Sequence, residues 1–139
     1  MALEHDIIAH ASFHFEDLQL SSKEFYHAVE DQLKYYEYPS LHTSRVSLSG
    51  SSWFVGREYL CVQYNEYRFY ICAAPFGKSY FVSWWLKRQP GFWARFFKNR
   101  MRKTLYQQDT EDLFLQSVKK IIEALVEKVN IDKGFLNKD

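Results

Sequence analysis

The segment from Lys87 to Thr104 combines the two kinds of side chain that bind anionic partners. Its eighteen residues contain seven cations and no carboxylate, with large aromatic rings between the cations. The cations attract phosphate, while the rings insert into a lipid headgroup layer or stack on unpaired bases. The segment therefore predicts binding to an anionic surface or to a nucleic acid. The candidate binding residues are Trp85, Lys87, Arg88, Phe92, Trp93, Arg95, Phe96, Phe97, Lys98, Arg100, Arg102 and Lys103.

The same segment allows several structural interpretations. If residues 92–105 form a helix, Trp93, Phe97, Met101 and Leu105 lie on one face, as in a helix that binds the surface of a membrane. Alternatively, the rings cap the domain's own core while the cations remain in water, or the rings are buried between two copies of the chain. The spacing alone does not choose among these arrangements.

Charge is unevenly distributed, although the formal net charge is only +1. Residues 1–38 hold eight acidic and two basic side chains, residues 39–108 hold two and eleven, and residues 109–139 hold seven and five. This pattern predicts a basic face opposite an acidic one, which would steer anionic partners. The sequence shows neither a spanning apolar run nor a signal peptide, so we expect a cytoplasmic protein, peripheral to the membrane if the segment binds lipid.

The spacing of the histidines is weak evidence for a metal site. His10 and His14 lie four residues apart, and Asp17, His27 or His42 would have to complete the set of ligands. No second paired motif of the zinc type accompanies them. We therefore expect no metal and no cofactor.

Enzyme chemistry likewise lacks a sequence motif. Cys61 and Cys72 fall inside predicted strands, which favours buried structural thiols over a nucleophile. No Gly-x-Ser-x-Gly motif and no phosphate-binding loop is present. A pocket for a small ligand on a polar face of the sheet is a further candidate, formed by Arg57, Glu58, Tyr59, Gln63 and Arg68.

Two amphipathic helices are predicted. Ser21 and Glu24 have the spacing of a capping box, which starts a helix over residues 21–37. The run Asp109-Thr110-Glu111-Asp112 is expected to cap a second helix, over residues 110–130, whose apolar stripe ends near Gly134.

Strands occupy most of the remaining chain. A strand is expected from Thr43, and two more at 57–64 and 67–73 are expected to form a hairpin through Asn65-Glu66. This hairpin pairs Leu60 with Ile71, Val62 with Phe69 and Cys61 with Tyr70, so the thiols are diagonal neighbours and form no disulfide.

Residues 73–77 are expected to form the next turn, because they include Pro75 and Gly77. A strand over 79–86 follows and points Trp84 and Trp85 to opposite faces. Residues 7–15 fit either a strand or a short helix, and the alternation of Phe13 and Phe15 with His14 favours a strand.

Five motifs are spread along the chain: Ser44-Arg45-Val46, Arg57-Glu58-Tyr59-Leu60, Ile71-Cys72-Ala73-Ala74-Pro75-Phe76-Gly77, Phe81-Val82-Ser83-Trp84-Trp85 and Asp109-Thr110. Together they resemble a family of uncharacterised bacterial proteins over most of residues 13–125. The resemblance implies a hydrophobic insert after the Ser-Trp-Trp strand, whereas this chain has a short basic and aromatic stretch there. A membrane role that the resemblance implies would therefore be contact with the surface, and the resemblance implies no catalytic residue.

These patterns predict one α+β domain over residues 1–139, with an antiparallel meander sheet of four or five strands and two helices on one of its faces. The expected function is that of a non-enzymatic interaction module, whose segment 87–104 contacts an anionic membrane surface or a protein partner there. A protein that binds single-stranded nucleic acid is the alternative, followed by a domain that binds a small ligand on the sheet. A homodimer is compatible with each of these functions.

Overall fold

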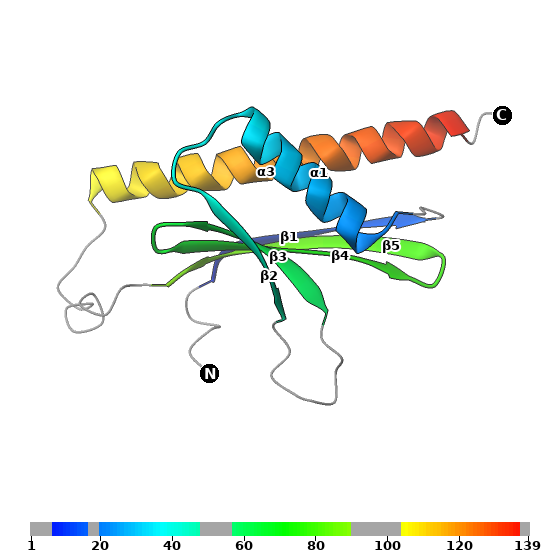
Figure 1. Cartoon of the computed structure of the whole chain (residues 1–139), viewed down its shortest axis with the longest axis horizontal. Helices are drawn as coiled ribbons and strands as arrows, with labels where there is room; N and C mark the ends of the chain where they lie inside the picture. Colours follow the sequence, from blue (N-terminus) through cyan, green and yellow to red (C-terminus); the bar gives the residue numbers. More distant parts are fainter. Residues whose placement is uncertain (1–6, 17–19, 48–56, 90–103, 137–139) are drawn as a thin grey trace.

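The computed structural model describes residues 7–16, 20–47, 57–89 and 104–136. It has an α+β fold, in which helices α1 and α3 lie over one face of a five-stranded antiparallel sheet (Figure 1). The sheet order is β1-β5-β4-β3-β2, so the expected meander holds from β2 to β5 and β1 is added beside β5. The elements are β1 (Ile7–Glu16), α1 (Ser22–Tyr35), β2 (His42–Ser47), β3 (Glu58–Tyr64), β4 (Tyr67–Phe76), β5 (Ser79–Arg88) and α3 (Leu105–Leu136).

Helix α1 begins at the predicted capping box. The Glu24 amide donates to the Ser21 hydroxyl oxygen at 3.0 Å, and the Ser21 amide donates to a Glu24 carboxylate oxygen at 3.4 Å. These contacts satisfy two amides that a helix start would otherwise leave without partners. The helix buries Phe25, Tyr26, Val29 and Leu33 against the sheet and helix α3.

The predicted hairpin between β3 and β4 is confirmed residue by residue. Leu60 pairs with Ile71, Val62 with Phe69, and the turn is Asn65-Glu66. The described cysteines, Cys61 and Cys72, are both free.

The turn between β4 and β5 lies later than the sequence predicted. Strand β4 continues through Pro75 to Phe76, and the turn consists of Gly77 and Lys78. Gly77 has a φ of +61°, a conformation that glycine adopts without steric cost. Pro75 pairs with Tyr80 of β5. The pairing of β4 with β3 has already ended at Ile71. A proline is tolerated there because β4 has become an edge on that side.

Helix α3 begins earlier than predicted, at Leu105, after the cap residue Thr104. The Gln107 amide donates to the Thr104 hydroxyl at 3.1 Å, and the Thr104 amide donates to the Gln107 side chain at 2.9 Å. The expected cap, Asp109-Thr110, lies inside the helix, and the Thr110 hydroxyl donates to the Tyr106 carbonyl. The helix also continues past Gly134 to Leu136, beyond the expected end.

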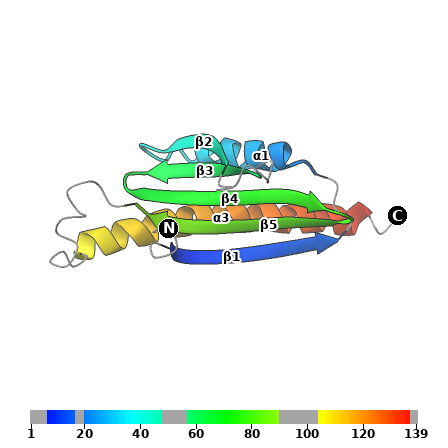
Figure 2. The ribbon, with the colours of Figure 1, turned by 90° about the horizontal axis from the view of Figure 1, so that it is seen from below.

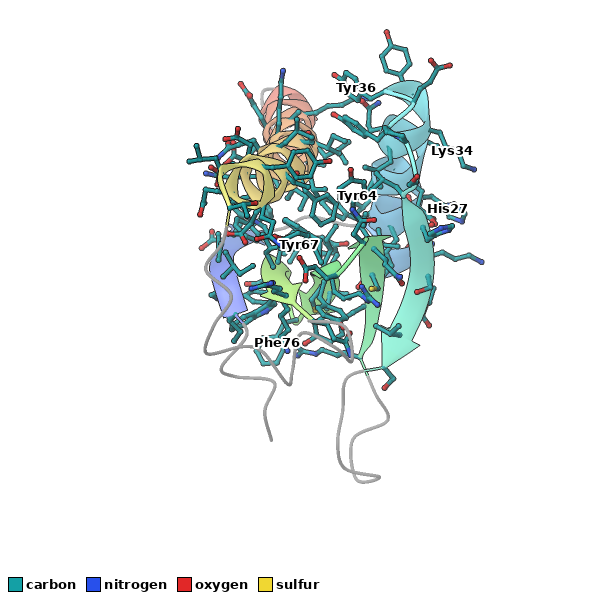
Figure 3. All side chains as sticks on the ribbon, turned by 90° about the vertical axis from the view of Figure 1, so that its left-hand side faces the viewer. His27, Lys34, Tyr36, Tyr64, Tyr67 and Phe76 are labelled. Carbon is teal, nitrogen blue, oxygen red and sulfur yellow. The ribbon has the colours of Figure 1, made fainter. Side chains whose placement is uncertain are left out.

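The core lies between the helices and the inner face of the sheet. Trp84 is buried on this face, and its ring stacks on Phe69 with centroids 5.0 Å apart. Figure 3 looks along the sheet from the end where Tyr64 and Tyr67 lie, and side chains fill the layer between strands and helices. The Tyr67 hydroxyl donates to the buried carboxylate of Glu111 at 3.2 Å.

Tyr26 connects α1 to two strands through one hydroxyl group. It donates to the Glu58 carbonyl of β3 and accepts from the Ala73 amide of β4 at 3.1 Å. Burial is the main cause that raises the pKa of Tyr26 from 10.0 to about 12. The protonated phenol is therefore the form that the folded chain stabilises.

We expect alkali to destabilise the fold through its buried phenols. Burial, aided by Glu111, also raises the pKa of Tyr67 to about 12, so the folded state keeps protons that the unfolded chain releases above pH 10.0. The free energy of unfolding should be fully retained below that pH and fall as pH rises towards about 12. Urea unfolding at several pH values would measure this slope.

A Tyr26→Phe variant isolates the hydroxyl of Tyr26. It leaves the buried Ala73 amide without its partner, so we expect a loss of about 1–3 kcal/mol at neutral pH and a shallower alkaline slope. Tyr35→Phe, at a side chain that is 75% exposed, is the matched control and should change neither quantity. Equal stability of the two variants would contradict this role of Tyr26.

Candidate binding face of the sheet

The structure describes only part of the predicted binding segment. Trp85, Lys87 and Arg88 lie at the end of β5. The remaining candidates, Phe92, Trp93, Arg95, Phe96, Phe97, Lys98, Arg100, Arg102 and Lys103, lie outside the described residues. The described part of the site is therefore formed by the strands of the sheet.

The sheet face opposite the helices carries no helix in the described part of the chain. In Figure 2 this face is turned towards the viewer, with the five strands in front of both helices. Side chains alternate between the two faces of a strand, so Trp84 points into the core and Trp85 points to this outer face, as the sequence predicted.

An aromatic row crosses the centre of the outer face. Tyr70 of β4 lies opposite Trp85 of β5, and Trp85 lies opposite His10 of β1. The rings of His10 and Trp85 are stacked, with centroids 3.5 Å apart and an angle of 18° between their planes. His10 Nδ1 lies 2.8 Å from the Trp84 carbonyl and donates to it, since a carbonyl can only accept. This hydrogen bond fixes the imidazole ring over the indole.

A polar and cationic row runs beside the aromatic row. Gln63, Arg68 and Lys87 are opposite one another on β3, β4 and β5. They lie two residues along each strand from Cys61, Tyr70 and Trp85, so the rows are about 7 Å apart. The Lys87 ammonium group lies 5.5 Å from the centre of the Tyr70 ring, which joins the two rows.

The charge of this face is positive near the two rows. Within the described strands, the acidic side chain on the outer face is Glu16, at the far end of β1, where it pairs with Ser79. Arg88 faces the opposite way and pairs with Glu66, with Arg88 Nε 3.2 Å from a carboxylate oxygen. Arg88 is therefore less available to a ligand than the sequence predicted.

Tyr70, His10 and Arg68 belong to this surface although the sequence analysis did not place them with Trp85. The predicted hairpin placed Tyr70 opposite Cys61, and the structure confirms this pair. The sequence did not predict which strand pairs with β5 on the side away from β4. Only the pairing of β1 with β5 brings His10 to Trp85.

The buried thiols of Cys61 and Cys72, on the same face of the sheet, are poor nucleophiles. Burial is the main cause that raises the pKa of both Cys61 and Cys72, so the thiol form dominates near neutral pH. Both side chains are buried although they lie on the outer face. They act as small packing residues there.

The histidines proposed as metal ligands are spread over the molecule. His10 and His14 lie on β1 at one border of the sheet, His42 on β2 at the other, and His27 on α1. Asp17 lies outside the described residues. Within the described ranges, no group of three or more histidine, cysteine or acidic side chains could hold a metal ion.

Two hollows on the helix side have less binding chemistry. The one between α1 and β2 contains Arg45, which lies 2.7 Å from Glu30 and 3.6 Å from Glu58, so its charge is already compensated. Glu58 therefore serves this ion pair and not a polar ligand face. The other hollow, between α3 and the loop after α1, is lined mainly by apolar side chains such as Leu41 and Leu113.

Comparisons with known proteins add no functional assignment. No protein family, no curated protein and no solved structure matches the chain. The resemblance noted in the sequence therefore stays a prediction. No helix in the described residues is long and apolar enough to cross a membrane.

We expect the two cysteines to be unreactive in the folded protein. Cys61 is 5% exposed and Cys72 is 1% exposed, and burial disfavours the thiolate in both. A thiol reagent such as dithionitrobenzoate should label neither side chain on the timescale of minutes at pH 8, and both after denaturation in guanidinium. Rapid labelling without denaturant would contradict their burial.

Proposed function

We propose that the outer face of the sheet binds single-stranded nucleic acid. The observation that carries this proposal is the aromatic row of Tyr70, Trp85 and His10 beside the row with Arg68 and Lys87. Aromatic side chains stack on bases of any sequence, and cations along the same surface attract the phosphates. The spacing of about 7 Å between the rows lets one nucleotide contact both.

Three features support a polymer over a small ligand. The rows cross several strands, so they offer repeated contacts along an extended chain. The stacked pair of His10 and Trp85 is held by the Trp84 carbonyl, which reduces the conformational entropy lost on binding. The two hollows described above lie on the helix side of the sheet and not on this face.

A fluorescence anisotropy titration with a labelled oligothymidylate tests this function. Loss of one stacking ring costs about 1–3 kcal/mol, so Trp85→Ala should weaken binding by about fivefold to 150-fold. Lys87→Gln should weaken binding and lower the slope of log affinity against log salt by about 0.7. Neither change removes a core residue, and circular dichroism checks that both variants fold.

Matched controls lie on α1, away from the outer face. Tyr35→Ala removes a ring that is 75% exposed, and Lys34→Gln removes an exposed cation. Both should bind the oligonucleotide like the wild type. Wild-type binding by Trp85→Ala, or no binding by the wild type at low salt, would reject the outer face as the site.

A second candidate is contact with an anionic membrane surface, or with a protein partner there, through the segment 87–104. The observation that favours it is the exposure of the apolar residues that directly follow the segment. Leu105 is 87% exposed and Tyr106 is 79% exposed at the start of α3. Apolar side chains beside a strongly basic stretch are typical of interfacial binding.

Vesicle sedimentation distinguishes the second candidate from the first. A Leu105→Asp, Tyr106→Asp variant places carboxylates in the first turn of α3, where a helix tolerates them, and it removes two apolar anchors. We expect about tenfold weaker binding, or a greater loss, to vesicles with phosphatidylserine, and no binding of either protein to pure phosphatidylcholine at low salt.

Phe76→Asp is the control for vesicle binding, because Phe76 is 71% exposed at the distant end of β4, next to the turn to β5. It should leave vesicle binding unchanged. Equal binding of wild type and the double variant would remove Leu105 and Tyr106 from the contact.

A further inference from the structure

The two borders of the sheet differ in how they are protected from another strand. Edge strands expose amides and carbonyls that can pair with a further chain, and proteins usually protect them with short length, charge, proline or bulges. β2, at one border, has six residues. The side chains of Arg45 and Thr43 on β2 donate hydrogen bonds to Glu30 of α1. Helix α1 therefore covers the inner side of this strand.

β1, at the other border, lacks these protections over most of its length. It has ten residues, and its pairing with β5 is regular from Ala9 to Glu16. The register shift lies at the beginning of the strand, between Ile7 and Ala9. Residues 9–15 contain no lysine, arginine, carboxylate or proline. Figure 2 shows β1 as the lower border of the sheet, with no described element beyond it.

The inner side of β1 is also incompletely covered. Ala11 and Phe13 pack against the core but remain partly exposed, whereas their partners on β5, Trp84 and Val82, are buried. On α3, Leu113 lines the hollow beside α1, so Leu115, two residues or about 200° further round, faces the β1 side. Leu115 is likewise only partly buried. A half-covered apolar rim therefore runs along the open edge.

We propose that a second copy of this chain pairs with β1, in antiparallel orientation, through β1 of both copies. An antiparallel edge is complementary to itself, because a two-fold axis brings each free amide to a free carbonyl of the partner. Charge does not oppose this pairing, since the central part of β1 has no permanently charged side chain. Because the edge at β2 is protected, pairing of β1 with β1 is favoured over pairing of β1 with β2. Pairing of β1 with β1 is symmetric and therefore stops at two chains.

The pairing joins the two five-stranded sheets into one continuous surface. When residues on the same side of β1 pair across the axis, His10, Ser12 and His14 of both copies lie on the outer face, and Ala11 and Phe13 lie on the inner side. The two apolar rims then cover each other. The outer faces then meet at the dimer axis. The inference itself rests on the edge and not on nucleic-acid binding.

Substitution of lysine at exposed positions of β1 tests the dimer. Ser12 and His14 are exposed on the outer face, and a Ser12→Lys, His14→Lys variant places four ammonium groups near the axis of the pair. Like charges on neighbouring strands repel, so the dissociation constant should rise at least about tenfold. Sedimentation velocity over a range of concentrations, without nucleic acid, measures it, with the wild type expected to be a dimer.

The opposite border supplies a control with the same residue types. His42 and Ser44 are also two residues apart and exposed on the outer face, so His42→Lys, Ser44→Lys makes the same chemical change on β2. This variant should remain a dimer. A monomeric wild type at the highest soluble concentration, or an equal effect of both variants, would overturn the proposal.

Hydrogen exchange gives a readout that does not depend on substitution. In the wild type, alternate amides of β1 that point away from β5 should exchange slowly at high concentration and faster after dilution. Exchange of these amides at one concentration-independent, fast rate would overturn the pairing, even if another surface formed a dimer.

Discussion

The alternation of side chains along β3, β4 and β5 is the constraint on which the rest of the structure depends. Leu60 faces Ile71 and Ile71 faces Trp84, while Val62, Phe69 and Leu86 form the next buried row. A shift of the register by one residue would expose these apolar side chains to water and place the side chains of the outer face under the helices. Burial of the inner rows therefore fixes the register of the three central strands.

The composition of the outer face is a consequence of the same register. Once Ile71 and Trp84 are opposite each other inside, Tyr70 and Trp85 must be opposite each other outside. The cationic partners Arg68 and Lys87 follow two residues along the strands. The hydrophobic core on the inner face therefore also fixes the positions of the side chains on the candidate binding face.

Local sequence patterns predicted the fold well where one interaction dominated. The capping box at Ser21 and the hairpin at Asn65-Glu66 were confirmed, because hydrogen bonds within a few residues define both. The predictions failed where two local signals competed. Thr104-x-x-Gln107 is also a capping box, but the acidic run at Asp109 resembled a helix start more closely.

The turn at Gly77 and the site itself show a second limit. Pro75 suggested a turn because proline breaks a central strand, yet the ladder to β3 ends at Ile71 and leaves that side of β4 free. The neighbour of β5 was likewise undetermined, since nothing local links Trp85 to His10, 75 residues earlier in the chain. Long-range strand order therefore decided which residues share the candidate site.

The widths of the two layers explain why β1 differs from the other strands. Two packed helices, with diameters of about 10–12 Å and axes about 8–10 Å apart, cover about 18–22 Å, whereas five strands spaced about 4.8 Å apart are about 24 Å wide. Helix α1 covers the border at β2, where Glu30 binds Arg45 at 2.7 Å. The missing cover therefore falls at the opposite border, beside α3, where Phe13 remains partly exposed although its partner Val82 is buried. The position of α1 over β2 thus leaves the opposite border, at β1, as the incompletely covered one in the described part of the chain.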